Sequence, residues 1–283
     1  MDVGPQTTDH RPLVTAGAFR PSSVARRLWS SAQRPLLITA LLLLAACARG
    51  DDTWPQIESS GVLRVGVDPT FPPFAAAEGP EAWGLDIDLA RALAAKLGLE
   101  ARFTYFGYDG LYDALATKQV DALASALVIM PERTQDVAYT DGYYDAGQVL
   151  IVPQGAPVAG MSDVGNGRLA VELGALGHVE AQAWQRRLPA LSVATYSSVD
   201  EALAAVATGA ADAALIDSVS GRLYLRDHPD AALTRVAAPM TSEPYAIAVR
   251  IGDQTLHRRL NEALRALAES GELDAIVSRW LGP

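Results

Sequence analysis

The chain has 283 residues, of which 49% are hydrophobic and 20% are charged, a composition typical of a globular protein long enough for two domains. Its net charge is −10, and residues 47–283 alone hold 18 basic and 31 acidic side chains, a net charge of −13. This acidic excess argues against a nucleic-acid partner, because phosphate binding needs clustered Lys and Arg. With a single cysteine and four scattered histidines, the sequence predicts no disulfide framework, no metal site and no cofactor.

The N-terminal segment has the pattern of an export signal. Arg26, Arg27 and Arg34 precede an apolar run of about eleven residues that ends at small residues before Cys47. This predicts a secretory signal peptide over residues 1–46, with an apolar part too short for a permanent membrane span. The residues before Val24 are long for such a leader, and a start codon placed too early would explain them.

The end of this segment, residues 44–47, resembles a bacterial lipobox. In such a motif the cysteine is lipidated and becomes the mature N-terminus. Residues 47–56 would then be a lipid-anchored tether, with Cys47 holding the protein at the membrane and the folded part beginning near Ile57. The alternative is an ordinary cleavage site at which Cys47 is one more small residue.

The first regular elements form a strand followed by a helix. Residues 62–67 are a β-branched run that predicts a buried strand, and residues 84–97 carry a leucine every fourth position, which predicts an amphipathic helix. We expect Asp86 or Asp88 to cap the first turn of this helix.

Similar units follow in chain order. Residues 101–106 predict a strand, 111–117 a helix and 120–123 a strand; later, 168–171, 192–196 and 212–217 predict strands, and 177–187 and 202–207 predict helices. Setting Asp121 against Asp212 aligns residues 115–117 with 206–208. Two such sets predict two α/β lobes with helices on both faces of each sheet.

Two extended apolar runs and two C-terminal helices are predicted in addition to these α/β units. Residues 148–152 and 245–250 are extended apolar runs next to prolines, the first leading into the second lobe and the second leading out of it. The chain should then end in two helices, one over about residues 253–270 and one ending near Trp280.

Residues 84–97 resemble the signature of the bacterial extracellular solute-binding proteins, family 3, the polar amino-acid-binding group of ABC importers, and the likeness extends over residues 61–280. This resemblance implies a two-lobed α/β periplasmic-binding-protein fold, type II-like, with two mixed sheets flanked by helices. Residues 148–152 and 245–250 would be the two crossover strands that act as a hinge. Lobe 1 would comprise residues 57–149 and 245–283, and lobe 2 residues 150–244.

The same resemblance implies how a ligand would be held in the cleft between the lobes. Residues 125–133 match a family segment in which the arginine, here Arg133, binds the ligand's α-carboxylate, a contact suited to a planar guanidinium. The alternative is that Arg133 forms a surface ion pair with Glu132 or Asp136. Across the cleft Asp217 would receive the ammonium group, or would cap a helix starting near Ser218.

Further site residues follow from the resemblance: Asp68 as a second carboxylate, Phe71 and Tyr108 as two rings around the ligand side chain, and Ser125, Ala126, Val128 and Ala175 as contacts. Phe74 is expected in the core. Family members usually carry hydroxyls where this chain has Val128 and Ala175. Either backbone amides replace those hydroxyls, or the ligand is not a standard α-amino acid.

The leading functional prediction is a periplasmic or cell-surface, lipid-anchored, monomeric protein that delivers an amino acid or related zwitterion to an ABC permease and does no chemistry. A second class is an enzyme like a cyclohexadienyl or arogenate dehydratase, with Glu172 or His178 as the acid or base. A third is the ligand-sensing component of a membrane receptor, against which the lack of a second apolar segment weighs.

Overall fold

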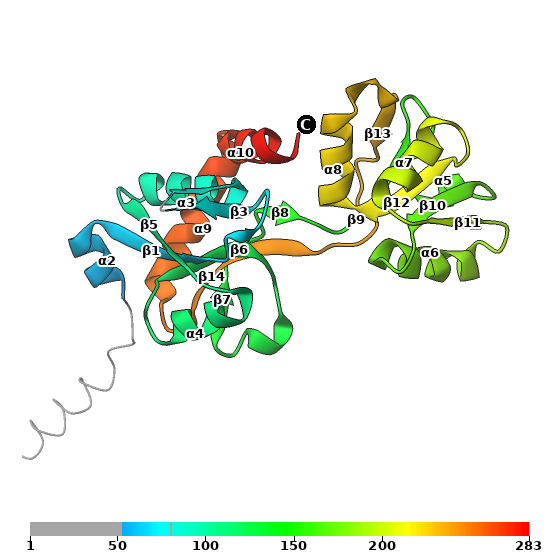
Figure 1. Cartoon of the computed structure of the whole chain (residues 1–283). Coiled ribbons are helices and arrows are strands. Elements are labelled where there is room, and N and C mark those ends of the chain that lie inside the picture. The colour runs from blue at the N-terminus through cyan, green and yellow to red at the C-terminus, as the bar shows by residue number, and fades with distance from the viewer. Residues whose placement is uncertain (1–52, 80, 283) are drawn as a thin grey trace, which may run out of the picture. The chain divides into compact units, whose positions relative to one another are not determined.

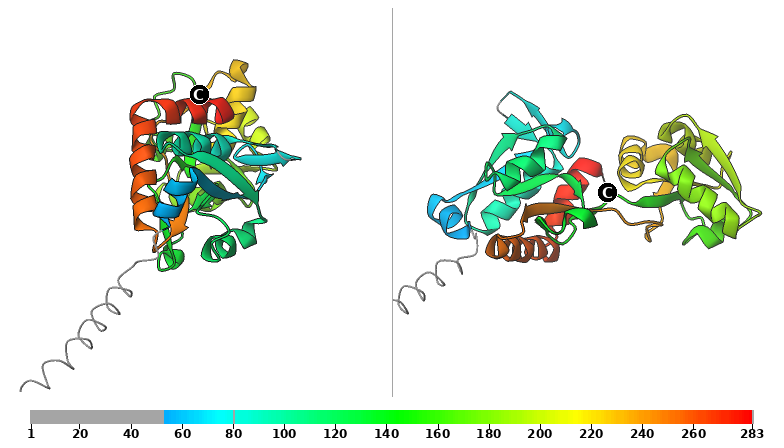
Figure 2. Two further views of the ribbon diagram at one scale, coloured as in Figure 1. Left: turned by 90° about the vertical axis from the view of Figure 1, so that its left-hand side faces the viewer. Right: turned by 90° about the horizontal axis from the view of Figure 1, so that it is seen from below.

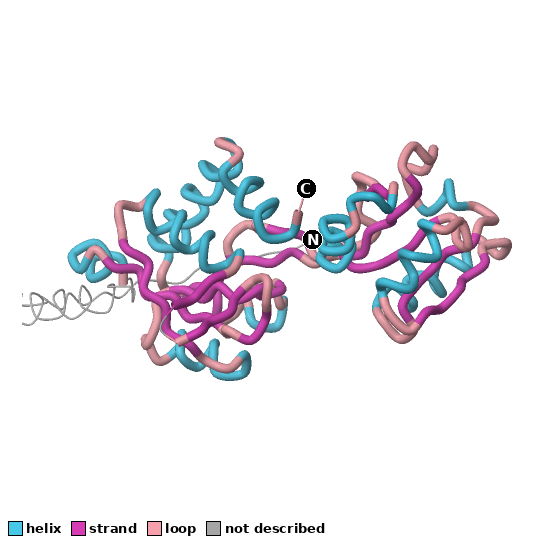
Figure 3. Tube along the Cα trace, turned by 45° about the horizontal axis from the view of Figure 1, so that its top comes forward, coloured by secondary structure: helices cyan, strands magenta, loops and turns pink. Residues whose placement is uncertain are grey.

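Two mixed β-sheets, each with helices on both faces, organise residues 53–79 and 81–282, the part of the chain that the computed structural model describes (Figure 1). The strands of the two sheets form separate groups in the Cα trace of Figure 3. The predicted signal peptide and Cys47 lie outside the described residues. None of the described helices is long and apolar enough to cross a membrane.

The first sheet has the order β5-β1-β6-β14-β7, with β8 also paired to β14. Its parallel core is β5 (Glu100–Tyr105), β1 (Val62–Val67) and β6 (Ala122–Val128), whereas β14 (Pro244–Arg250) runs antiparallel to β6, β7 (Val137–Tyr139) and β8 (Tyr144–Asp145). Helices α3 (Leu85–Lys96), α9 (Gln254–Glu269) and α10 (Glu272–Leu281) share one apolar cluster with this sheet, and α4 (Leu111–Ala116) packs in another. A small sheet of β2 (Thr70–Phe71), β3 (Ala75–Glu78) and β4 (Glu81–Trp83) precedes α3.

The second sheet has the order β11-β10-β12-β9-β13. Its strands are β11 (Ser192–Tyr196), β10 (Arg168–Glu172), β12 (Ala213–Asp217), β9 (Gln148–Pro153) and β13 (Leu233–Arg235). Helices α7 (Val199–Ala207) and α8 (Ser218–Asp227) pack on one face, and α5 (Met161–Val164) and α6 (Leu176–Arg187) on the other, as the views of Figure 2 show. The predicted strands and helices therefore recur within a few residues of their expected ends. The sequence did not predict the small sheet β2-β3-β4 or the short strands β7, β8 and β13.

The two lobes repeat one local arrangement. In the first, the Asp121 carboxylate accepts hydrogen bonds from the backbone N–H of Arg64 (3.1 Å) and from its guanidinium (2.6 Å). In the second, the Asp212 carboxylate accepts from the backbone N–H of Arg168 (2.7 Å) and lies 3.8 Å from its Nε. The match of Asp121 with Asp212 therefore reflects a shared local arrangement, in which each aspartate joins the strand that follows it to a neighbouring parallel strand, β6 to β1 and β12 to β10.

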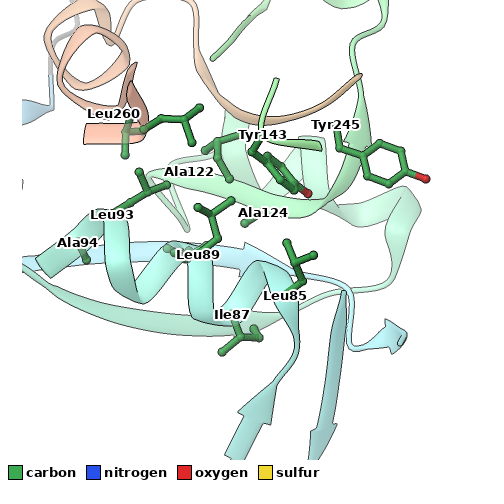
Figure 4. Close-up of a cluster of buried hydrophobic side chains, with 14 of the residues drawn as sticks. Leu85, Ile87, Leu89, Leu93, Ala94, Ala122, Ala124, Tyr143, Tyr245 and Leu260 are labelled. Carbon is green, nitrogen blue, oxygen red and sulfur yellow. The ribbon is translucent and has the colours of Figure 1, made fainter. Parts of the chain in front are cut away.

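Helix α3 packs as its leucine spacing predicts, but its start differs from the expectation. Leu89 and Leu93 are 0% and 1% exposed and point toward β6 and Tyr143 (Figure 4). The N-cap residue is Gly84, and no side chain caps the helix. The capping prediction is wrong because both carboxylates have partners elsewhere: Asp86 bonds to residues of other strands and loops, and Asp88 accepts from Arg279 and Trp280 of α10.

The chain crosses from the first sheet to the second between Asp145 and Gln148, and returns between Arg235 and Pro244. The division into lobe 1 (residues 57–149 and 245–283) and lobe 2 (residues 150–244) stays a prediction. Asp145 joins the two crossings by accepting from Ser242 Oγ (2.7 Å) and the Glu243 N–H (2.7 Å). The fold begins earlier than expected, with helix α2 (Trp54–Ser60), whose Trp54 is buried in the first lobe.

Candidate ligand-binding site

A pocket of about 360 Å³ opens on the first lobe beside the carboxyl ends of its parallel strands. It brings together five of the predicted ligand contacts with two further residues. Its lining is Asp68, Thr70, Phe71, Tyr108, Ser125, Ala126 and Tyr245. Asp68 follows β1, and Ser125 and Ala126 lie in β6, which places them at the edge where ligands bind in open α/β sheets.

The Asp68 carboxylate is buried and held in place by its neighbours. Its Oδ1 accepts from Thr70 Oγ1 (2.7 Å) and the Thr70 N–H (3.0 Å), and the Asp68 N–H donates to Ser125 Oγ (3.0 Å). None of the ion pairs within residues 53–79 and 81–282 includes Asp68. Among the described residues, therefore, no lysine or arginine pairs with the carboxyl group in this pocket.

Two rings form the open side of this pocket. Phe71 and Tyr108 are 49% and 47% exposed, which is unusual for large apolar side chains. Phe71 stacks on Phe74 with ring centres 5.5 Å apart, and Phe74 is fully buried, as the sequence predicted. Burial raises the pKa of Tyr245 to about 12, so this residue lines the pocket as a neutral phenol.

The back wall of the pocket is fixed by a buried carboxyl group. Asp86 Oδ2 accepts from the Ala126 N–H (2.7 Å) and its Oδ1 accepts from the Tyr143 hydroxyl (2.6 Å). Ala126 has φ +46°, a left-handed conformation that residues with a Cβ rarely adopt, so this bond holds a strained residue in the pocket wall. Complete burial raises the pKa of Asp86 to about 7, although both hydrogen bonds act in the opposite direction.

A second pocket, of about 190 Å³, lies on the second lobe. Ala175 and Asp217 line it together with Gln148, Glu172, Leu176, Gly177, Val199, Leu215 and Ile216. Asp217 Oδ1 accepts from the Ser220 N–H (2.8 Å), so this residue caps α8, one of the two roles that the sequence left open. Ala175 is the N-cap residue of α6.

Arg133 and Val128 line neither of these pockets. The Arg133 guanidinium lies over the ring of Tyr112, 4.0 Å from its centre, and lines a separate cavity of about 530 Å³. Within the described residues Arg133 forms no ion pair with Glu132 or Asp136, the alternative that the sequence offered. Val128 is exposed at the end of β6. The role of Arg133 in carboxylate binding remains a prediction.

Gln148 and Tyr245 line the two pockets but were not among the predicted contacts. Each stands at or next to the start of the antiparallel strand that follows a lobe crossing, β9 for Gln148 and β14 for Tyr245. The sequence signal that could have identified Gln148 is a polar residue at the first position of a buried apolar strand. His, Cys, Asp and Glu side chains of the described segments form no group of three that could hold a metal ion.

Solved structures resemble this arrangement over most of the chain. A polar amino acid ABC uptake transporter substrate binding protein from Streptococcus thermophilus matches with a TM-score of 0.72 and 25% identity, over 83% of this chain and 91% of that one. An ancestral cyclohexadienyl dehydratase matches with a TM-score of 0.69 and 25% identity, over 81% of this chain and 95% of that one. The two-lobed periplasmic-binding-protein fold is thereby confirmed.

Relatives of known description extend the likeness to the sequence. A probable histidine-binding protein of Neisseria gonorrhoeae is 29% identical over 250 residues, which are 87% of this chain and 92% of the relative. The model of the bacterial extracellular solute-binding proteins, family 3, matches residues 63–283. Since that match covers most of the sequence, the chain belongs to the bacterial extracellular solute-binding proteins, family 3.

Proposed function

We propose that this protein captures an amino acid or a related small zwitterion between its two lobes and delivers it to an ABC permease. The observation that carries the proposal is the division of the predicted contacts: Asp68 with Phe71 and Tyr108 in a pocket of the first lobe, and Asp217 in a pocket of the second. A ligand that bridges both pockets would stabilise the closed arrangement of a hinged pair of lobes.

Each contact would have a definite role. Asp217 would bind the ligand's ammonium group while it continues to cap α8, and the exposed rings of Phe71 and Tyr108 would enclose the side chain. Arg133 would bind the carboxylate after leaving the face of Tyr112, a cation–π contact worth about 0.5–2 kcal/mol. A charge-assisted, bidentate carboxylate contact can offset that loss.

The test is thermal unfolding of the purified protein with histidine, arginine, glutamine and glutamate, which differ in side-chain charge. A ligand at a hundredfold excess over Kd stabilises the folded state by about 2.7 kcal/mol, a rise of several degrees in Tm. Asp217→Asn, which preserves helix capping, should abolish the rise. Asp227→Asn at the other end of α8, where Asp227 pairs with Arg226, is the matched control and should keep it.

If no member of such a panel, extended to other amino acids and zwitterions, raised the Tm, the proposed function would be wrong. An equal rise in wild type and Asp217→Asn would remove the ammonium assignment alone.

Export and anchoring belong to the same proposal. A signal peptide over residues 1–46 and lipidation of Cys47 would hold the protein, as a monomer, at the outer face of the membrane that contains the permease. The pattern of residues 26–47 supports this, and family relatives are described as periplasmic or extracellular binding proteins.

One observation favours a second candidate, a dehydratase. The ancestral dehydratase shares the fold, and Glu172 lines the pocket of the second lobe, where a carboxyl group could act as an acid or base. His178 does not line that pocket; its ring nitrogens bond to Gly174 and Gln182. Turnover of prephenate or arogenate by the purified protein, lost in Glu172→Gln, would establish this function in place of transport.

A further inference from the structure

Helix α8 belongs to the second lobe, yet one of its sides contacts the first lobe. Tyr224 and Leu225 pack in a core cluster of the second lobe, whereas Val219 and Leu223 pack against the core cluster of the first. Because Val219 and Leu223 are four residues apart, they lie on one side of the helix. This side of α8 therefore forms an interface between the lobes in addition to the two chain crossings.

Two arginines on the same side of α8 bind the end of α10. Arg226 Nη1 donates to the Trp280 carbonyl (2.8 Å), and Arg222 Nη2 donates to the Gly282 carbonyl. Backbone carbonyls at the end of a helix have no partner within it and carry a partial negative charge. A guanidinium suits them well, because it has several donors and a permanent positive charge.

Gly282 lets the two helices approach closely enough for these hydrogen bonds. A Cβ at this position would lie only 2.8 Å from the Cβ of Arg226. We call the contacts of Arg222 and Arg226 with the carbonyls of Trp280 and Gly282 the α8–α10 contact. It is close-packed as well as hydrogen-bonded, so it tolerates little movement of one helix relative to the other.

The first residue of α8 is attached to a chain crossing. The Ser218 N–H donates to the Gly147 carbonyl (3.0 Å), and the Ser218 and Tyr144 hydroxyls are hydrogen-bonded (2.9 Å). Arg226 lies eight residues farther along α8, a distance of about 12 Å at 1.5 Å per residue. A rotation of the lobes by about 15° at the crossing would move Arg226 by about 3 Å, enough to break its hydrogen bond to Trp280.

The two pockets indicate which arrangement of the lobes the α8–α10 contact favours. Among the described residues, none lines both the pocket of the first lobe and that of the second. A ligand that touches both pockets therefore requires the lobes to move. Since the α8–α10 contact is formed while the pockets are separate, it stabilises the arrangement that precedes this movement.

We propose that the α8–α10 contact holds the lobes apart in the free protein, and that Arg222 and Arg226 thereby set the ligand affinity without touching the ligand. The inference rests on the proposed function, in which one ligand bridges both lobes. Binding must offset the loss of the α8–α10 contact. Removing that contact raises the fraction of the free protein that can close, and the apparent affinity rises with this fraction.

The decisive variant is Arg222→Met combined with Arg226→Met, because methionine removes both guanidinium groups and preserves the helix propensity of α8. Its affinity should be at least fivefold higher than that of wild type, measured by calorimetry with whichever of histidine, arginine, glutamine or glutamate binds wild type. Arg168→Met is the matched control, since Arg168 Nη2 donates to the Gly209 carbonyl (2.9 Å) within the second lobe. This control should leave the affinity unchanged.

A second measurement needs no ligand. Spin labels at Ser59→Cys in the first lobe and Ala190→Cys in the second, both exposed positions, report the separation of the lobes in a Cys47→Ser background. Double electron–electron resonance on the free protein should show a second distance population when Arg222 and Arg226 are both replaced by methionine. The labelled wild type and its Arg168→Met form should both lack this population.

A pair of glycine variants tests the close packing independently of the arginines. Gly282 and Gly271 both have a left-handed backbone, with φ +84° and +77°, but only Gly282 has neighbours within 4 Å of an added Cβ. Gly282→Ala should therefore raise the affinity as the loss of the arginines does. Gly271→Ala carries the same backbone strain and should leave the affinity unchanged.

The outcomes separate this inference from the proposed function. An affinity that does not rise in the double arginine variant, or a distance distribution equal to that of wild type, would overturn the role of the α8–α10 contact and leave the proposed function intact. If wild type bound no amino acid or related zwitterion, the proposed function would be wrong and the role of the contact in affinity would fall with it. The label distances would then still decide whether the contact holds the lobes apart.

Discussion

Asp86 provides the sharpest test of the physical reasoning, because its carboxyl group is buried in the wall of the ligand pocket. Its pKa is raised from 3.8 to about 7, mainly by burial, while the bonds from Tyr143 and Ala126 favour the ionised form. The replacement Asp86→Asn keeps a carbonyl oxygen for the Ala126 N–H and an amide for the Tyr143 oxygen. It removes the charge at every pH.

Proton binding by Asp86 sets the direction in which folding stability changes with pH. In the folded protein Asp86 holds its proton up to about pH 7, whereas in the unfolded chain it loses it near pH 3.8. Folding stability therefore decreases as pH rises between these two values, and the loss is complete above the folded pKa. Each pH unit between these two pKa values changes the free energy of unfolding by about 1.36 kcal/mol. Because the change ends near pH 7, the wild type should lose about 2.7 kcal/mol of stability relative to Asp86→Asn between about pH 5 and pH 8.

Urea unfolding of both proteins at about pH 5 and pH 8 measures this difference, since the titration of all other groups cancels between them. Tyr143→Phe should steepen the pH dependence, because the hydroxyl bond that favours the ionised carboxylate is lost. A difference between wild type and Asp86→Asn that stays constant over this range would refute the raised pKa and the burial argument behind it.

Three other results are expected. Arg133→Ala should abolish the ligand-induced rise in Tm and lower the stability of the free protein by no more than about 0.5–2 kcal/mol, the contribution of its contact with the Tyr112 ring; an undiminished rise would remove the carboxylate assignment. Gly147→Ala should destabilise the protein by about 1–3 kcal/mol in urea unfolding. The added Cβ would lie 2.1 Å from the Thr241 carbonyl oxygen and would force apart the two segments that cross between the lobes. Gly107→Ala, which has open space around its Cβ, is the control and should leave the stability unchanged. Cys47→Ser should move the mature protein from the detergent phase to the aqueous phase; a wild type that stays aqueous would contradict lipidation.

Most of the regular elements followed from short-range patterns. The β-branched run of β1 and the leucine spacing of α3 identified both elements, since these patterns depend on neighbours two to four residues apart. The small sheet β2-β3-β4 escaped prediction because its strands have only two to four residues and show no alternation. Family resemblance implied ligand contacts at Asp68, Phe71, Tyr108, Ser125 and Ala126; these five residues line one pocket, and their binding role stays a prediction.

The failures concern polar side chains whose partners are distant in sequence. Asp86 at the start of a helix satisfies every local rule for a cap, yet its carboxylate bonds to Ala126 and Tyr143, which the sequence places 40 and 57 residues away. Gln148 was treated only as the first residue of a strand, because nothing in its neighbourhood shows that strand pairing sets it against Asp217.

The sequence by itself determined the order of strands and helices, the doubling of the α/β unit and the family. Only the tertiary structure decided which charges are buried, which have partners, and which remain available to a ligand. The physical reason is that hydrophobic periodicity is a local property of the chain, whereas a carboxylate, guanidinium or amide accepts many partners. The strand order of the two sheets, acting over long sequence separations, decides which partner lies within hydrogen-bond distance.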